Sequence, residues 1–110
     1  MGYPPIEDFA VLKMGEHYGP HSGWGWKHIW SEELEEGRFH DYYLKHGYGD
    51  LKGEALQRKI LEDIENALRY GEITPMPERE SVVYRWNEIE VVVSTKEKNC
   101  GSIITAHPGD

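Results

Sequence analysis

The hydrophobic pattern of the chain changes abruptly at Gly71, and this change restricts the fold more than any other feature of the sequence. Before it, residues 53–70 carry apolar side chains at spacings of three and four, which predicts an amphipathic helix. The predicted stripe consists of Leu56, Ile60, Leu61, Ile64, Ala67 and Leu68. After it, residues 81–86, 89–95 and 102–106 are short runs rich in β-branched and aromatic residues, which favour strands. Helices followed by an antiparallel meander predict an α+β fold.

The sheet is expected to contain three to four antiparallel strands. Asn87-Glu88 and residues 96–101 are the turns between the three clear runs, and a fourth strand near residues 72–76 is the alternative to its absence. Because residues 91–93 are all valine, the middle strand is expected to be covered on both faces. We therefore expect N-terminal helices packed on a small antiparallel sheet.

The N-terminal half reads as loop followed by helix. Residues 26–36 have helical spacing of apolar side chains and end at Gly37, and residues 38–45 continue as a second short helix. The expected organisation is a single domain, 1–110, with an irregular lead-in at 1–23, a mainly helical part at 24–71 and an antiparallel sheet at 72–108.

The chain is acidic, with 12 Lys and Arg residues against 20 Asp and Glu residues and a formal net charge of −8. This balance excludes a protein that coats nucleic acid without specificity, because such proteins gain affinity by neutralising phosphates. The acids are unevenly spread. Residues 32–36 are almost all glutamate, whereas residues 17–31 contain no acid and include Lys27 and three histidines. A neutral or basic site on an acidic body is therefore compatible with the composition.

Cysteine content and hydropathy bear on the compartment. Cys100 is the only cysteine, so no internal disulfide can form. No apolar run approaches the roughly 20 residues of a membrane span, and residues 1–5 lack the regions of a signal peptide. We expect a cytoplasmic protein, or a module of an exported or phage-borne protein, that uses no cofactor.

Three histidines, at positions 17, 21 and 28, raise the question of a metal. His17 and His21 are four residues apart, a spacing that places two ligands on one helix face, with His28 as a third. However, Gly19 and Pro20 lie between the first two and disfavour a helix there. A zinc-binding domain is therefore the third and weakest hypothesis.

Lys27 and His28 stand at the start of the helix predicted for residues 26–36. Free N–H groups and the helix dipole attract anions at such a position, Lys27 adds charge, and His28 can exchange a proton near neutral pH. The alternative is that His28 only caps or packs. The sequence therefore makes Lys27 and His28 candidates for a phosphate site.

The strands supply three further candidates. Arg85 lies in a strand that is otherwise apolar or aromatic, and Thr105 and His107 are two residues apart near the end of the last strand, hence on one side of it. Together with Lys27 and His28, these residues match the needs of metal-free phosphodiester cleavage. One imidazole takes the 2′-hydroxyl proton, another protonates the leaving 5′-oxygen, and the cations and the hydroxyl hold the charged transition state.

This order of motifs resembles the barnase–EndoU–colicin–RelE (BECR) nuclease superfamily, and in particular its phage- and toxin-associated branch. The resemblance covers residues 24–108: Lys-His-Ile opens a helix, a long amphipathic helix follows, and then come Tyr84-Arg85-Trp86, a valine-rich strand and a closing Ile-Thr-Ala-His-Pro. Members are small α+β endoribonucleases with N-terminal helices on a four-stranded antiparallel sheet. The resemblance thus implies the same architecture and activity for this chain.

The resemblance also implies residue roles. His28 would be the first catalytic histidine, Arg85 the phosphate ligand, and Thr105 and His107 the C-terminal catalytic pair, with Lys27 as a second phosphate ligand. Many members carry an aromatic residue at the place of His107, so packing on a base is the alternative role there. Trp24 and Trp26 are candidates for base stacking, with core packing as the alternative. His40 and His46 are interpreted as surface or packing residues, with a position of His40 facing the cleft as the alternative.

Two functions of different classes follow. The leading hypothesis is a metal-independent toxin- or phage-type endoribonuclease that cleaves RNA, with tRNA as one candidate, to a 2′,3′-cyclic phosphate and a 5′-hydroxyl. Its partners would be RNA and a cognate immunity protein or antitoxin. The alternative is a non-enzymatic acidic protein-binding module of the immunity or regulator type, which presents residues 32–36 to a basic partner.

Overall fold

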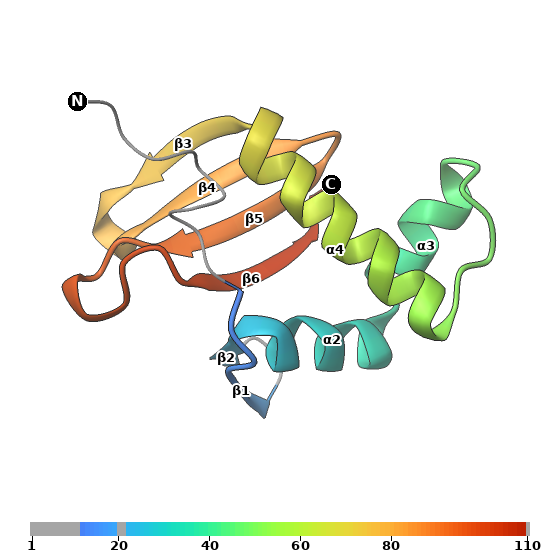
Figure 1. Cartoon of the computed structure of the whole chain (residues 1–110), viewed down its shortest axis with the longest axis horizontal. Coiled ribbons are helices and arrows are strands. Elements are labelled where there is room, and N and C mark those ends of the chain that lie inside the picture. Colours follow the sequence, from blue (N-terminus) through green and yellow to red (C-terminus); the bar gives the residue numbers. More distant parts are fainter. Residues whose placement is uncertain (1–11, 20–21, 110) are drawn as a thin grey trace.

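The computed structural model describes residues 12–19 and 22–109 (Figure 1). The elements in chain order are β1 (Glu16–Gly19), β2 (Ser22–Trp24), α2 (Gly25–Glu36), α3 (Arg38–Lys45), α4 (Gly53–Tyr70), β3 (Glu72–Met76), the 3₁₀ turn η1 (Pro77–Arg79), β4 (Ser81–Trp86), β5 (Ile89–Ser94), the 3₁₀ turn η2 (Glu97–Asn99) and β6 (Ile103–Pro108). The α+β class predicted from the change of pattern at Gly71 is confirmed. In the described part of the chain, no helix has the length and apolar character needed to span a membrane.

The main sheet is a four-stranded antiparallel meander in the order β3-β4-β5-β6. The fourth strand is therefore present, at Glu72–Met76, where it pairs with β4. The link between β4 and β5 is a two-residue turn in which Asn87 and Glu88 have φ angles of 47° and 68°. Such left-handed pairs match the twist of the two strands they join. This tight turn fixes which residues of β4 and β5 face each other.

The core lies between one face of this sheet and the helices. Helix α4 crosses that face, and α2 lies beside the edge strand β6 (Figure 1). The stripe of α4 is buried as predicted, except that Leu61 is 40% exposed. In β5, Val91 and Val93 are buried on the core side, whereas Val92 on the other side is only partly buried. The second face of the sheet is thus less covered than the valine run suggested.

Helix α3 is held against α4 by a buried polar contact. The Tyr43 hydroxyl donates to Asp63 Oδ2 at 2.7 Å, and Lys59 Nζ lies 3.5 Å from Asp63 Oδ1. Burial raises the pKa of Tyr43, so its hydroxyl stays protonated and remains the donor. A buried carboxylate needs partners of this kind, and both come from helices α3 and α4 themselves.

Part of the expected irregular lead-in is a β-hairpin. Strands β1 and β2 pair antiparallel, with Glu16 opposite Trp24 and His17 opposite Gly23. Gly23 adopts a φ of 141°, and a side-chain carbon there would lie 2.4 Å from the Glu16 carbonyl oxygen. Glycines that usually indicate a loop here allow two strands to approach closely. The first eleven residues of the lead-in lie outside the described part of the chain.

A His40–Asp50 contact connects α3 to the loop before α4. The hydrogen bond to Asp50 raises the pKa of His40 above 6.5 and lowers that of Asp50 below 3.8. The contact therefore contributes stability fully between pH 3.8 and 6.5. This contribution is lost as pH rises through the raised pKa of His40, and as pH falls through the lowered pKa of Asp50.

We expect Asp50→Asn to move the titration of the His40 ring to lower pH. In urea unfolding, the stability difference between wild type and variant should be largest near pH 6 and should shrink as pH rises through the pKa of His40. NMR titration of the imidazole measures the first effect. Asp41→Asn is the matched control with a smaller expected shift, because Asp41 contributes less to the raised pKa. An unchanged His40 titration in Asp50→Asn would contradict the assignment.

Candidate functional site

Strands β4, β5 and β6 of the meander place Arg85, Glu90 and His107 side by side. Arg85 is directly opposite Glu90, and Glu90 is directly opposite His107. Residues directly opposite each other project from the same sheet face. Arg85 Nη1 donates to Glu90 Oε2 at 3.0 Å. We call this set the Arg85–Glu90–His107 row.

The row lies on the sheet face away from the core. The buried residues Tyr84, Val91 and Ala106 alternate with it on the core face. The Arg85 side chain is 47% exposed and Glu90 is 26% exposed. Since neighbouring strands are about 4.8 Å apart, the ends of the row are separated by about 10 Å of backbone. The three side chains therefore project from one sheet face within this span.

Thr105 is in the adjacent row on the same face, where it is opposite Val92. The prediction that Thr105 and His107 share one side of the last strand is confirmed by the strand register, which likewise places Val83 and Arg85 on one side of β4. The antiparallel pairing then brings both sets to a single face. Thr105 and His107 are both partly buried.

Glu90 was missed by the sequence reasoning, although a signal for it existed. A two-residue turn at Asn87-Glu88 places Trp86 opposite Ile89, and therefore Arg85 opposite Glu90. An acid inside an apolar strand that faces an arginine across a tight hairpin is an informative pattern. It gives the row a carboxylate, the group that can act as a general base.

His28 is not part of this row. The residue is only 3% exposed. Its Nδ1 lies 3.0 Å from His17 Nδ1, and its Nε2 lies 3.2 Å from Glu32 Oε1. Both ring nitrogens thus have partners in the protein. The capping or packing alternative describes this position better than a catalytic role.

The start of α2 is already occupied by the chain. The backbone N–H groups of Trp26 and Lys27 donate to the carbonyl oxygens of Lys13 and Met14, at 2.8 and 2.7 Å. These are groups that the sequence reasoning assigned to an anion. The Lys27 side chain is exposed and belongs to α2, which lies beside the sheet edge at β6. Two of the backbone N–H donors that the predicted anion site requires are therefore already bonded to the protein.

The two candidate stacking residues are partly buried. Trp26 lies parallel to Trp30, with ring centroids 6.0 Å apart and an interplanar angle of 11°. Both rings pack against the hydrophobic core. Trp24 ends β2 and immediately precedes α2. For Trp26, core packing accounts for the position.

Of the three histidines in the zinc hypothesis, only two are seen in contact with each other. His17 and His28 meet, but His21 lies outside the described residues. Among residues 12–19 and 22–109, no group of three metal-ligating side chains comes together. The contact between the two imidazoles is a hydrogen bond within the protein.

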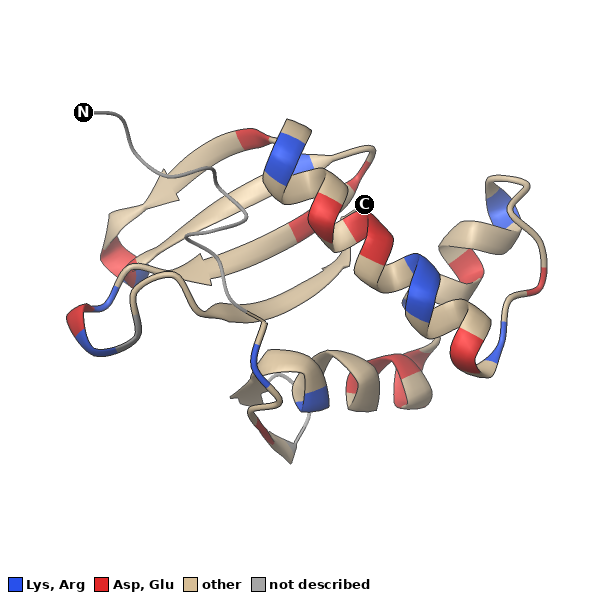
Figure 2. Cartoon of the chain, in the orientation of Figure 1, with Lys and Arg blue, Asp and Glu red and all other residues tan. Residues whose placement is uncertain are grey.

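The acidic run of residues 32–36 is not a uniform solvated face, although Figure 2 shows its acids gathered on the second half of α2. Glu33 is 6% exposed, and its carboxylate accepts hydrogen bonds from the backbone N–H groups of Phe39 and His40, at 2.7 and 3.1 Å. Burial raises the pKa of Glu33. Glu32 contacts His28 and Glu35 contacts His17. This removes part of the surface that the binding-module alternative requires.

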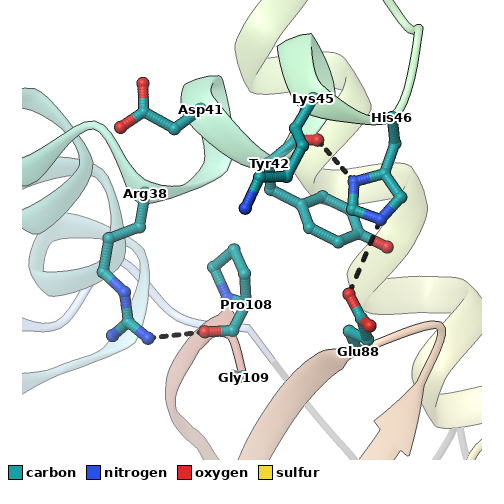
Figure 3. Close-up of a pocket in the computed structure, with 8 residues that line it drawn as sticks. All are labelled: Arg38, Asp41, Tyr42, Lys45, His46, Glu88, Pro108 and Gly109. Carbon is teal, nitrogen blue, oxygen red and sulfur yellow. Dashed lines mark hydrogen bonds and ion pairs between the residues drawn. The ribbon is translucent and has the colours of Figure 1, made fainter.

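A cavity of about 530 Å³ lies between α3, the β4–β5 turn and the end of β6 (Figure 3). Its lining residues are Arg38, Asp41, Tyr42, Lys45, His46, Glu88, Pro108 and Gly109. We call it the α3 cavity. The sequence reasoning treated His46 as a surface or packing residue and did not single out Arg38 or Lys45. Their convergence depends on how α3 packs against the sheet end, which no local pattern encodes.

Comparison with known proteins adds no relative. No protein-family model matches the chain, and neither the curated proteins nor the solved structures contain a match. The α+β arrangement is therefore established by the coordinates alone. Any function has to be argued from the residues of the sites described above.

Proposed function

We propose that this protein is a metal-independent endoribonuclease whose active site is the Arg85–Glu90–His107 row with Thr105. The observation that carries the proposal is the strand register, which aligns a guanidinium, a carboxylate and an imidazole on one accessible sheet face. These three groups are a cation for the phosphate, a general base and a general acid.

In the proposed reaction, Glu90 accepts the proton of the ribose 2′-hydroxyl, and the 2′-oxygen attacks the adjacent phosphorus. The bond between phosphorus and the 5′-oxygen breaks, and His107 donates a proton to that oxygen. The products are a 2′,3′-cyclic phosphate and a 5′-hydroxyl, so no water is consumed in this step. The Arg85 guanidinium and the Thr105 hydroxyl hold the phosphate oxygens as negative charge develops.

The contacts of His107 suit proton donation. Its Nδ1 lies 3.3 Å from the carbonyl oxygen of Pro108. Because a carbonyl oxygen only accepts, Nδ1 carries a hydrogen in this contact, and Nε2 is the atom available for exchange with the leaving oxygen. Glu90 takes the base role in this proposal and His28 takes none, because His28 is buried and both of its ring nitrogens have partners within the protein.

The net charge of −8 limits which RNA molecules the proposed enzyme can bind. General repulsion of phosphates weakens nonspecific binding, so the proposed enzyme takes structured or otherwise selected RNA, with tRNA as one candidate. The toxin- or phage-type assignment and a cognate immunity protein or antitoxin are parts of the proposal that rest on the resemblance. Cytoplasmic action is a part that rests on cysteine content and hydropathy.

The test is incubation of purified protein with total RNA in excess EDTA, followed by analysis of the new ends. We expect cleavage with 2′,3′-cyclic phosphate termini, a loss of about 100-fold or more in Arg85→Ala, and retained cleavage per folded molecule in His28→Ala. A wild-type protein that leaves the RNA intact would overturn the proposal, as would equal activity in Arg85→Ala.

A further inference from the structure

The α3 cavity adjoins the proposed active site. Strand β6 carries His107 in the row, and the next residues, Pro108 and Gly109, line the cavity. A side-chain carbon built on Gly109 would lie 3.0 Å from Glu90 Oε2, so the Glu90 side chain lies directly beside the backbone of Gly109, which lines the cavity. Glu88, two residues before Glu90, also lines the cavity. A chain of nucleotides can therefore occupy both places.

The cavity presents cations to its interior. The Lys45 amine points toward Pro108 (Figure 3), and no ion pair joins Lys45 to another residue of the described chain. Arg38 uses one N–H to bond the Pro108 carbonyl oxygen at 2.6 Å. A guanidinium has five such donors, which leaves others for a ligand. Two permanent cations in one hollow suit a phosphate group.

The acids of the cavity compete little with this role. The Asp41 carboxylate is directed away from the centre of the cavity (Figure 3). Glu88 Oε2 lies 3.6 Å from His46 Nε2, and His46 Nδ1 lies 2.8 Å from the Tyr42 carbonyl oxygen. The rings of His46 and Tyr42 also contact each other, with centroids 4.2 Å apart. The cavity therefore combines the Arg38 and Lys45 cations with an aromatic wall.

We propose that the α3 cavity is a second RNA subsite that holds a nucleotide flanking the scissile one, with Lys45 and Arg38 on its phosphate group. The inference rests on the proposed function and adds a substrate class to it. The substrate is single-stranded RNA at the cleavage position, bound through at least two phosphates. A volume of about 530 Å³ lies within the usual range of ligand sites.

The probe is a fluorescently labelled octanucleotide of 2′-O-methyl RNA, which lacks the attacking hydroxyl and is not cleaved. Its Kd is measured by anisotropy at several salt concentrations. We expect Lys45→Ala to weaken binding by about 3- to 10-fold at low salt and to reduce the slope of log K against log salt by about 0.7, the value for one phosphate of a single strand. Lys98→Ala is the matched control, because this exposed lysine lies in the loop at the opposite end of the sheet.

The outcomes separate the two proposals. If wild type binds the octanucleotide and both lysine variants bind as wild type does, the subsite is wrong, while the proposed function stands on its own cleavage assay. If wild type cleaves RNA in EDTA but does not bind the octanucleotide, the subsite is again wrong. If wild type neither cleaves nor binds, both proposals fail. Weakened binding in both Lys45→Ala and Lys98→Ala indicates general charge attraction and overturns the subsite.

Discussion

Glu90→Gln is expected to lower the rate of RNA cleavage by about 100- to 10,000-fold, the usual contribution of one acid–base group. Glutamine keeps the length of the side chain and an oxygen that can accept from Arg85, which in the wild type lies 3.0 Å away. It cannot accept the 2′-hydroxyl proton. The measurement is the initial rate of cleavage of a defined RNA in EDTA, with thermal unfolding recorded for each variant.

Glu72→Gln is the control for this prediction. Glu72 lies on the edge strand β3, directly opposite Arg85 and on the same sheet face as the Arg85–Glu90–His107 row. It is exposed. Loss of one surface carboxylate there should leave the rate within about twofold, because no proton transfer depends on it. If both variants lose activity equally, the row acts only through its net charge, and Glu90 is not the base.

His107→Ala separates proton donation from base packing. We expect a loss of about 100- to 10,000-fold on ordinary RNA. In a substrate with sulfur in place of the leaving 5′-oxygen, the leaving group departs as a thiolate. It needs little protonation, since thiols are far stronger acids than alcohols. The defect should therefore largely disappear on that substrate. A defect of equal size on both substrates contradicts the acid role and favours the packing alternative.

Glu33→Ala is expected to lower the free energy of unfolding by about 2–4 kcal/mol, because one buried and one partly buried backbone N–H group lose their acceptor. Those groups, on Phe39 and His40, belong to the first turn of α3 and bond the two oxygens of Glu33 at 2.7 and 3.1 Å. The cost of burying the carboxylate, visible in the raised pKa of Glu33, offsets part of the gain. Urea unfolding at pH 7 measures the change.

Glu36→Ala is the matched control for Glu33→Ala, since Glu36 is on the same helix and exposed. It should change the free energy of unfolding by no more than about 0.5 kcal/mol. Equal effects of the two substitutions would mean that Glu33 acts as one acid among several and does not fix the start of α3. The orientation of α3 matters for the proposed RNA subsite, because Arg38 and Lys45 of the α3 cavity belong to it.

Regular local patterns were sufficient for most of the fold. The periodic spacing within residues 53–70 and the β-branched runs after Gly71 predicted α4 and the meander, because periodicity reports directly which side of an element is apolar. The β1–β2 hairpin was not predicted. Its glycines indicated a loop, and only the close approach of Gly23 to the Glu16 carbonyl explains why two strands form there.

The residues of the candidate site could be predicted within a strand and across a tight turn, but not where separate elements pack together. Alternation placed Thr105 with His107 on one side, and the turn at Asn87-Glu88 contained the pairing of Arg85 with Glu90. The position of His28 required the tertiary structure. A histidine at a helix start is chemically the same whether it faces a cleft or another histidine. How the preceding hairpin folds back and places His17 against His28 decides which of the two occurs.

The sequence by itself determined the α+β class, the helix stripe, the strand alternation and the acidic balance, because each of these depends on near neighbours in the chain. Only the tertiary structure decided that Glu33 is a buried cap, that His28 is enclosed, and that Arg38, Lys45 and His46 line one cavity beside the row. These facts depend on packing between different elements: neighbouring ones for Glu33 and His28, and elements far apart in sequence for the cavity. Burial and convergence are properties of that packing, and no local pattern of residues encodes them.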